Sequence, residues 1–500
     1  MTTLATRIRP LLLLLLGGLG LTFGQGHWPN GLALIIGIAC TIRFFRLAHP
    51  GAALPLFVVA HFVALEAAYA GMVPMPTPAR LGMWFGISLV LGLLLLVDRW
   101  VSRRWTSFAS TLVLPCGWVA FALATARLSP GGTWGSLAYS FADVLIVAQI
   151  ASLVGWTGLT FVAVWIGSVT NWWWTCRTDD SPRGRRGLLL AAECLAALAV
   201  FGVVRYATSP NATPVRVACV VAPNTFEDAT IDDVWAYTRG VEQSAESLER
   251  ARARIAESRG EHFAMVEQAI ADGAQLVSWP EVNAVMTAAE VDAWIAQAKA
   301  LAADRRVFIG MGMAVFRPAT EEATLNTYVL VDPTGEVVID FLKATRVPGR
   351  QHAIGDGVLP VVDTDLGRVS AAICFDLDFP HVIAQAGASK VDVLLAPSND
   401  WREAQATHAR MARLRAIEQG FALVRPTKDG TTLVTDATGR SRGHLTLADN
   451  RTGFIMVDVP FAHRWTLYAM IGDAFAWLCV AIFIALCACA AFVRPEADSQ

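Results

Sequence analysis

The sequence VSAAICFD, residues 369–376, decides the fold of the polar half of the chain. Its small and apolar residues run directly into Cys374, as expected of a buried strand that ends at a reactive position. Two further strand-like runs end in the same way, because Glu281 follows LVSWP and Lys343 follows IDFL. The ends of neighbouring strands meet at one rim of a sheet, so we expect Glu281, Lys343 and Cys374 to lie close together.

The same alternation of strands and helices continues outward from these three runs. Strand-like segments include residues 215–221 and 307–314, and helical segments include residues 244–273 and 407–419. Strand–helix–strand alternation, followed by pairs of strands, predicts a layered α/β domain. We place this domain at residues 211–463, which is long enough for a hydrophobic core of its own.

Composition separates this domain from the rest of the chain. Hydrophobic residues make up 54% of the protein and its mean hydropathy is +0.46, which is too apolar for an ordinary soluble protein. The formal net charge is −2, but acidic residues are scarce before Asp179. Of the nine cysteines, only Cys219 and Cys374 fall in the polar half, which excludes a disulfide framework and offers no metal-ligand spacing. We therefore expect part of the chain to lie in lipid, and we expect neither a metal nor a cofactor.

Apolar stretches long enough, or nearly long enough, to cross a bilayer occur before and after the polar domain. We count eight crossings, at roughly residues 8–24, 31–47, 52–72, 81–97, 108–126, 155–172, 187–207 and 468–493. Residues 7–24 have the features of a signal peptide, but the spans that follow at once favour an uncleaved first helix. Residues 137–154 are interrupted by two polar residues, so we interpret them as an interfacial or re-entrant segment. The predicted domains on either side are a seven-helix transmembrane domain at 1–210 and a last transmembrane helix with a cytoplasmic tail at 464–500.

Arginine clusters indicate the orientation of the chain in the membrane. They lie in alternate loops and at both ends, at residues 7–9, 43–46, 99–104, 177–186 and 494. The middles of the other loops contain no lysine or arginine. Because positive residues stay on the cytoplasmic side, both termini are predicted to be cytoplasmic and the polar domain exoplasmic. The clusters are explained as topology signals and need no nucleic-acid partner.

The three predicted site residues suit nucleophilic catalysis. A cysteine needs a base to form its thiolate, and Glu281 in a dry pocket would have a raised pKa suited to that task. Lys343 and the backbone N–H of Phe375 would stabilise the oxyanion of a tetrahedral intermediate. Each residue also has a simpler interpretation: Cys374 as a core residue, Glu281 as a cap of the following segment, and Lys343 as a solvated charge at a strand end.

Wider blocks around these residues resemble the apolipoprotein N-acyltransferase family, a membrane branch of the nitrilase superfamily. The blocks that carry the likeness are ASLVG (151–155), GLTF (158–161), LVSWPE (276–281), Lys343 with Val347 and Pro348, ICFD (373–376), PSNDW (397–401), HARMARLRAIE (408–418), VR (424–425), TLY (466–468) and GDAFAWLC (472–479). They extend over nearly the whole chain and flank the expected membrane spans in the right order.

The resemblance implies a four-layered αββα nitrilase-like sandwich on a base of eight transmembrane helices. In a ping-pong reaction, Cys374 would take a fatty acyl group from a phospholipid donor and pass it to the free amine of a lipoprotein's diacylglyceryl cysteine. Glu281 and Lys343 would act as base and oxyanion stabiliser. The enzyme would be a multi-pass monomer in the lipid of the bacterial cytoplasmic (inner) membrane, with its catalytic domain on the exoplasmic, periplasmic side.

Several positions depart from the pattern of that family. Gln351, with His352 beside it, stands where the family usually has a second glutamate that assists the lysine. Phe375 and Asp376 replace the usual Tyr-Glu pair after the cysteine. The segment 348–367 is shorter than the usual lipid-facing loop. These departures bear on the acyl donor and acceptor more than on the chemistry of the three reactive residues.

Two residues of a later helical run complete the predicted site. His408 and Glu418 are expected to support it by hydrogen bonds. Two other functions remain open beside lipoprotein N-acylation. In a membrane-tethered nitrilase-type amidase, water or a soluble amine would take the acyl group. A non-catalytic membrane assembly protein is disfavoured, because all three reactive residues are present.

Overall fold

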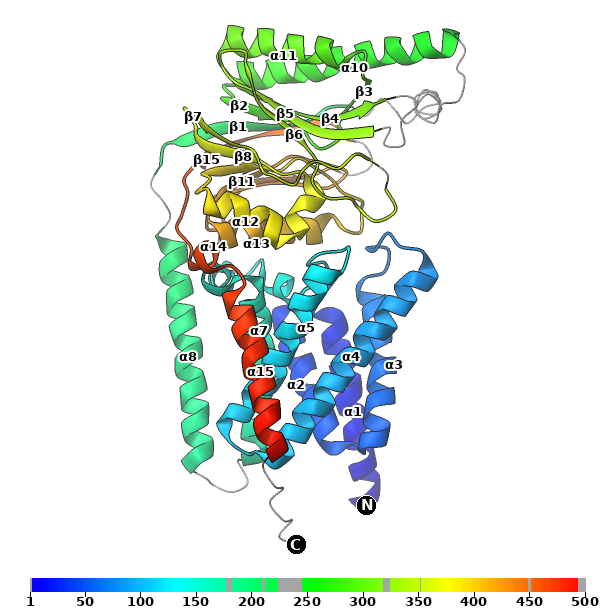
Figure 1. Ribbon diagram of the computed structural model, residues 1–500, viewed down its shortest axis with the longest axis vertical. Helices are drawn as coiled ribbons and strands as arrows, with labels where there is room; N and C mark the ends of the chain where they lie inside the picture. The colour runs from blue at the N-terminus through cyan, green and yellow to red at the C-terminus, as the bar shows by residue number, and fades with distance from the viewer. Residues whose placement is uncertain are drawn as a thin grey trace. The chain divides into compact units, whose positions relative to one another are not determined.

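The computed structural model describes residues 2–176, 182–208, 212–223, 245–317, 324–350, 352–447 and 451–492. The chain forms two compact units (Figure 1). A helical unit comprises Met1–Thr208 and Ile471–Gln500, and a mixed α/β unit comprises Ser209–Met470.

The helical unit consists mainly of long apolar helices. Their bounds are α1 (Thr2–Phe23), α2 (Gly31–Leu47), α3 (Pro50–Ala68), α4 (Thr77–Arg104), α5 (Val113–Leu128), α7 (Ala151–Cys176), α8 (Pro182–Ala207) and α15 (Ala474–Phe492), with the short helices η1 (Phe108–Leu112), η2 (Leu137–Phe141) and α6 (Leu145–Ala148). In the described part of the chain, six helices are long and apolar enough to cross a membrane: α3, α4, α5 together with η1, α7, α8 and α15. The apolar part of α1 is shorter and α2 has 17 residues. The predicted polytopic architecture is confirmed, whereas the count of eight crossings remains a prediction.

Local sequence explains where these helices begin and how closely they pack. Asn30 is the N-cap of α2, because its side-chain oxygen accepts hydrogen bonds from the backbone N–H groups of Leu32 and Ala33. Helices α1 and α2 approach closely at Gly20 and Gly37, where a Cβ added to Gly20 would lie 2.5 Å from the Cα of Gly37. Small residues permit such close packing between membrane helices.

The segment that we predicted to be interfacial or re-entrant, residues 137–154, does not form one long helix. It contains η2, α6 and the first residues of α7, which breaks at Val154 and Gly155. Gly155 has a φ of 71°, a conformation that glycine adopts without strain. The position of this segment relative to the membrane surface stays a prediction.

The mixed unit is built on two β-sheets that pack face to face (Figure 1). The first sheet has the order β15-β1-β2-β4-β5-β6, with β3 paired to β4, and the second has the order β14-β13-β11-β9-β8-β7. The strands of the first sheet are β1 (Pro214–Val221), β2 (Leu276–Ser278), β3 (Ala284–Thr287), β4 (Phe308–Phe316), β5 (Thr324–Val331), β6 (Val337–Leu342) and β15 (Gly453–Pro460). Those of the second are β7 (Val361–Thr364), β8 (Gly367–Ala371), β9 (Val393–Leu395), β11 (Ala422–Arg425), β13 (Thr431–Thr435) and β14 (Ser441–Thr446), and β10 (Ser398–Asn399) pairs separately with β12 (Thr427–Lys428).

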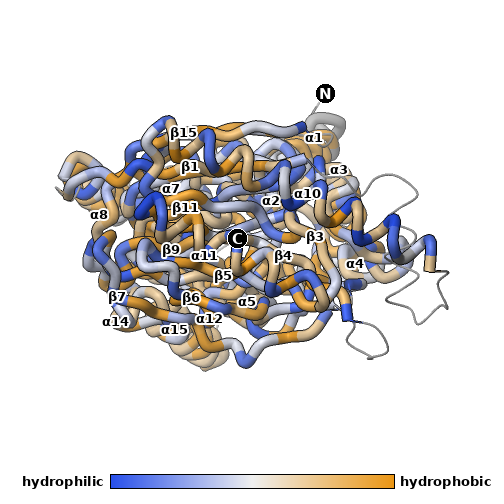
Figure 2. Tube along the Cα trace, turned by 90° about the horizontal axis from the view of Figure 1, so that it is seen from above, coloured by the Kyte–Doolittle hydropathy of each residue, from blue (hydrophilic) through white to orange (hydrophobic). Residues whose placement is uncertain are grey.

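Helices cover the outer faces of both sheets. The first sheet is covered by α10 (Ala245–Ala271) and α11 (Val291–Arg305), and the second by α12 (Pro380–Ala388) and α13 (Gln405–Gln419) (Figure 1). In Figure 2, the trace of α10 contains many residues coloured as hydrophilic. A hydrophobic core of side chains from both sheets fills the space between them. The layers therefore follow the order helix, sheet, sheet, helix, and the predicted αββα sandwich is confirmed.

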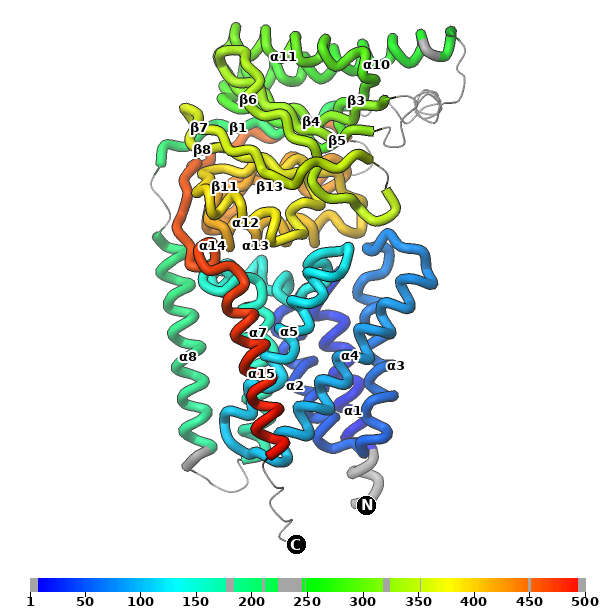
Figure 3. The backbone as a smooth tube through the Cα atoms, viewed as in Figure 1, coloured from blue at the N-terminus to red at the C-terminus, as the bar shows by residue number. Residues whose placement is uncertain are grey.

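The two chain ends of the mixed unit lie side by side. The first strand, β1, lies beside the last strand, β15 (Figure 3). The two strands pair antiparallel in a register that places Pro214 opposite Pro460. Within each sheet the central strands run parallel, as β1-β2-β4 and as β8-β9-β11. The residues that follow β2, β6 and β8 are those that the sequence singled out, and they form the site described next.

Candidate active site

Cys374 stands at a strained turn directly after β8. It is the first residue of the short helix η4 (Cys374–Asp378) and has a φ of 49°, a conformation that side chains other than glycine rarely adopt. Its backbone N–H donates to the carbonyl of Pro397 at 2.9 Å, and its Sγ lies 3.7 Å from the carbonyl oxygen of Asn399. These contacts hold the thiol in a buried position at the end of the second sheet.

Asp376 fixes this turn to the segment that follows Lys343. Its carboxylate accepts hydrogen bonds from the backbone N–H of Ile373 at 2.9 Å and from the N–H and hydroxyl of Thr345 at 2.8 and 2.6 Å. The side chain is fully buried, and burial raises the pKa of Asp376 to about 6 although Lys343 opposes this shift. The structure therefore places Asp376 between the nucleophile and the lysine, as a residue that positions both segments.

Glu281 follows β2 and receives three hydrogen-bond donors. Its Oε1 accepts from Lys343 Nζ at 2.5 Å and from Asn326 Nδ2 at 2.6 Å, and its Oε2 accepts from the backbone N–H of Asn399 at 2.9 Å. The next residue, Val282, has a φ of 47°, which is unfavourable for a β-branched side chain. Strained backbone conformations therefore occur both next to the Glu281 carboxylate and at Cys374 itself.

The environment keeps Glu281 ionised. Burial alone would raise its pKa, but Lys343, the hydrogen bond from Asn326 and the interaction with Cys374 lower it below its usual value. Our expectation that a dry pocket raises this pKa was wrong, because the neighbouring ammonium group outweighs desolvation. An ionised carboxylate can accept a proton from the thiol without first losing one.

Lys343 is a permanently charged partner of this carboxylate. It follows β6 directly, its side chain is 2% exposed, and its backbone N–H donates to the carbonyl of Asn326. Burial disfavours its charge, but Glu281, Cys374 and Asp376 outweigh burial and raise the pKa of Lys343. For Cys374, burial and the charge of Glu281 raise the thiol pKa well above its usual value, whereas Lys343 lowers it. The structure thus brings the three predicted residues together, with the resting cysteine in its thiol form.

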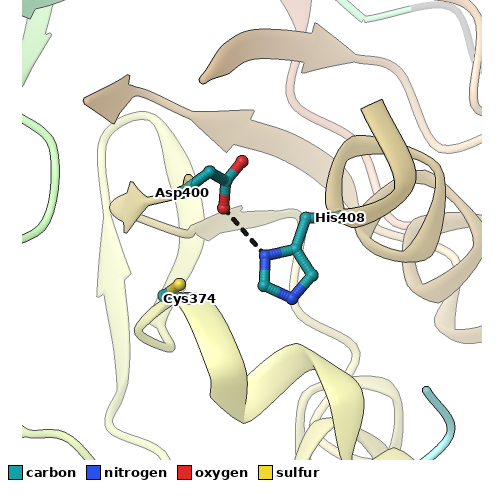
Figure 4. Close-up of side chains that lie close together, drawn as sticks. All are labelled: Cys374, Asp400 and His408. Atoms are coloured by element: carbon teal, nitrogen blue, oxygen red, sulfur yellow. Dashed lines mark hydrogen bonds and ion pairs between the residues drawn. The ribbon is translucent and has the colours of Figure 1, made fainter. Parts of the chain in front are cut away.

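A second group of buried charges lies near the thiol. The sulfur of Cys374, a carboxylate oxygen of Asp400 and a ring nitrogen of His408 lie within 4.8 Å of one another. The three side chains are drawn in Figure 4. Asp400 also accepts two hydrogen bonds from Arg425 Nη2, at 3.0 and 2.9 Å. Cysteine, aspartate and histidine are residue types that bind metals, but Arg425 and His408 already occupy the Asp400 carboxylate. We therefore interpret this group as an ion-pair network and do not assign a metal to it.

The remaining predicted residues differ in their relation to the site. Phe375 is buried and its ring packs edge-on against that of Phe379, with centroids 5.3 Å apart. Glu418 forms an ion pair with Arg415, also on α13, at 2.8 Å, so its carboxylate supports the helix that carries His408. Gln351 lies outside the described residues.

Among the side chains that sequence reasoning did not single out are Asn326 and Asp378, which contact Glu281 and His408. Asn326, from β5, donates to Glu281, and Asp378, from η4, accepts from His408. An asparagine inside a strand-like run, where this residue type is uncommon, was the available signal for Asn326. The sequence contains no comparable signal for Asp378, because its role depends on a histidine 30 residues further along the chain.

Comparisons with known proteins agree with this arrangement. The family model of carbon-nitrogen hydrolases matches residues 240–463, and that of the apolipoprotein N-acyltransferase N-terminal domain matches residues 17–169. Proteins named apolipoprotein N-acyltransferase match along much of the chain. One from Geobacter metallireducens is 24% identical over 88% of this chain and 88% of its own length. One from Gloeobacter violaceus is 25% identical, over 93% and 91%.

Among solved structures, an amidase of the nitrilase superfamily from Nesterenkonia is 19% identical, covers 54% of this chain and 98% of its own, and has a TM-score of 0.39. The sequence relatives are more informative, because they extend over both units. The two family models also match in the order in which the helical and mixed units occur. On these grounds, the chain belongs to the apolipoprotein N-acyltransferase family.

Proposed function

We propose that the protein transfers a fatty acyl group from a phospholipid to the free α-amine of an S-diacylglyceryl cysteine at the N-terminus of a lipoprotein. The observation that carries this proposal is the buried Glu281–Lys343 ion pair, which acts electrostatically on the strained Cys374 thiol. The names of the relatives supply the substrate class, and their matches extend over both units of the chain.

In the first half-reaction, Glu281 takes the proton from the Cys374 thiol as the sulfur attacks the ester carbonyl of the phospholipid. A carbon–sulfur bond forms, and the negative charge on the carbonyl oxygen is stabilised by Lys343 and the backbone N–H of Phe375. The ester carbon–oxygen bond then breaks. The proton on Glu281 passes to the departing alkoxide, which leaves as a lysophospholipid, and the acyl group remains on Cys374 as a thioester.

In the second half-reaction, the amine of the lipoprotein attacks the thioester carbonyl. Glu281 accepts a proton from the attacking nitrogen, and Lys343 again stabilises the oxyanion. The carbon–sulfur bond breaks as the amide forms, and Glu281 returns its proton to the leaving thiolate. The same three side chains therefore serve both steps, and no further reactant is consumed.

Both substrates are lipids, which fits a chain with several membrane-spanning helices. We place the protein in the bacterial inner membrane, with the mixed unit on the exoplasmic side, from the distribution of its arginines. A site above the outer leaflet would meet donor and acceptor while their acyl tails remain in lipid.

A two-substrate assay tests this function. Purified protein is incubated with a phospholipid that carries a labelled acyl chain and with a synthetic diacylglyceryl-cysteine peptide, either with a free amine or with an acetylated amine. Label is expected on the free-amine peptide alone. Label released as free fatty acid, at equal rates with both peptides, would instead identify an amidase-like hydrolase and contradict the proposal.

A further inference from the structure

His408 cannot act as a second base for Cys374. Its Nδ1 contacts Asp400 Oδ1 at 2.8 Å and its Nε2 contacts Asp378 Oδ2 at 3.3 Å, so a carboxylate faces each ring nitrogen. An ionised carboxylate only accepts hydrogen bonds, so both nitrogens must carry hydrogen. The ring is then an imidazolium, and the two carboxylates raise the pKa of His408 to about 9 although burial opposes its charge.

Carboxylates and cations alternate in this buried network. The groups that face the imidazolium include the carboxylates of Asp378 from η4 and Asp400 after β10 and the neutral Cys374 thiol, and Arg425 from β11 is bound to Asp400. Loss of the His408 proton would make the charge next to the sulfur more negative by one unit.

The thiol responds to charges in this network as well as to Glu281 and Lys343. The charge of Asp400 raises the pKa of Cys374 and the charge of Arg425 lowers it. The sulfur, an Asp400 oxygen and a His408 nitrogen lie within 4.8 Å of one another, a range in which single buried charges interact strongly. Figure 4 shows the three side chains at the corners of a triangle, with the imidazole of His408 hydrogen-bonded to Asp400.

We infer that His408 is a positioning residue whose fixed positive charge offsets the carboxylates of Asp378 and Asp400 and thereby permits Cys374 to become a thiolate. Glu281 and Lys343 determine which group holds the proton of the thiol, whereas the charge of His408 determines how stable the Cys374 thiolate is. The role rests on the proposed use of Cys374 as the nucleophile.

A double-mutant cycle that changes the charges at positions 378 and 408 tests this inference. The rate of Cys374 alkylation by iodoacetamide at pH 7 is measured by peptide mass spectrometry on the full-length protein in detergent. This probe reports the thiolate and needs no lipid substrate, so a wrong substrate assignment does not affect it. His408→Gln removes one positive charge from the network, and Asp378→Asn removes one negative charge.

His408→Gln is expected to slow alkylation by about tenfold or more, and Asp378→Asn is expected to accelerate it, because one charge within a few ångströms shifts a pKa by about one unit or more. The double variant restores the net charge of the parent and should react within about threefold of it. Structural damage would instead change the rate in the same direction in all three variants, so opposite signs in the single variants separate charge from folding.

Arg442→Gln is the matched control, since Arg442 forms an ion pair with the buried carboxylate of Asp436 and neither residue belongs to this network. Its alkylation rate should equal that of the parent. If His408→Gln does not fold, the comparison of Asp378→Asn with the double variant decides the sign. The inference is overturned if Asp378→Asn slows alkylation, or if the double variant reacts no faster than His408→Gln.

Discussion

At the scale of single residues, the chemistry depends on buried charges that compensate one another. Lys343 and Glu281 are 2% and 5% exposed, so neither charge is stabilised by water. A buried ion pair adds little net stability, but loss of one partner leaves an isolated charge and is costly. The pair is therefore better explained by reactivity than by folding, since it keeps a proton acceptor ionised beside the Cys374 thiol.

Lys343→Met is expected to destabilise the protein by about 3 kcal/mol or more, because it leaves the Glu281 carboxylate buried without its cation. It should also slow acyl-thioester formation by roughly 10² or more, the usual effect of losing an oxyanion stabiliser. The double variant Glu281→Gln/Lys343→Met should regain most of the stability and none of the activity. Thermal unfolding in detergent and a labelled-acyl gel measure the two effects. A double variant as unstable as the single one would disprove the electrostatic coupling.

His408 makes stability depend on pH in a defined window. Its folded pKa of about 9 lies above the ordinary value of 6.5, so the folded protein binds this proton more tightly than the unfolded chain does. The resulting stabilisation, roughly 3 kcal/mol, is complete below about pH 6.5 and is lost as the pH rises through about 9. Asp376, with a pKa of about 6, titrates below this window.

The thermal unfolding midpoint of the parent should therefore decrease as the pH is raised from 7 to 9.5. The variant His408→Gln/Asp378→Asn lacks the titrating group and provides the comparison. Its midpoint should change less over the same interval. Equal slopes for the two proteins would mean that His408 is not charged at neutral pH.

At the scale of secondary-structure elements, glycines set how closely α1 and α2 approach. A side chain at Gly20 would collide with the backbone of α2, whereas a Cβ at Gly18, on the same helix, meets no atom within 4 Å. Gly20→Val should destabilise the helical unit by about 1–3 kcal/mol through overpacking. Gly18→Val provides the control and should leave the unfolding midpoint within error. Detergent thermal shift assays measure both, and equal effects of the two substitutions would contradict this packing.

Much of the element order was predictable from sequence, because apolar periodicity and the residues at strand ends are local features. The predicted helix 407–419 corresponds to α13, and the predicted strand 369–373 is shifted by two residues from β8. The short edge strands β7 and β14 were missed, since few of their residues are buried and their pattern is weak.

The electrostatics of the site were harder to predict than its members. The direction in which the Glu281 pKa shifts depends on the positions of Lys343 Nζ and Asn326 Nδ2. Both residues are distant from Glu281 in the sequence. The same limit applies to His408, which was expected to support the site by hydrogen bonds. Its charge follows from two carboxylates that reach it from different segments.

At the scale of the whole molecule, orientation in the membrane can be tested independently of chemistry. Glu336 and Arg185 are exposed residues of the mixed unit and of α8. In intact spheroplasts, Glu336→Cys should react with a membrane-impermeant maleimide, because the topology that we propose from the arginine distribution puts the mixed unit outside. Arg185→Cys should react only after permeabilisation. Labelling of the parent protein measures the background from the native cysteines. Labelling in the reverse order would invert the proposed topology.

The central claim is that Cys374 carries the acyl group as a thioester, and mass spectrometry of the intact protein tests it most directly. After incubation with a phospholipid and no acceptor, the protein should gain the mass of one fatty acyl group on the peptide that contains Cys374. Hydroxylamine should remove it, and Cys374→Ala should never acquire it. An unmodified Cys374 in protein that nevertheless transfers acyl chains, or transfer by the alanine variant, would contradict the account.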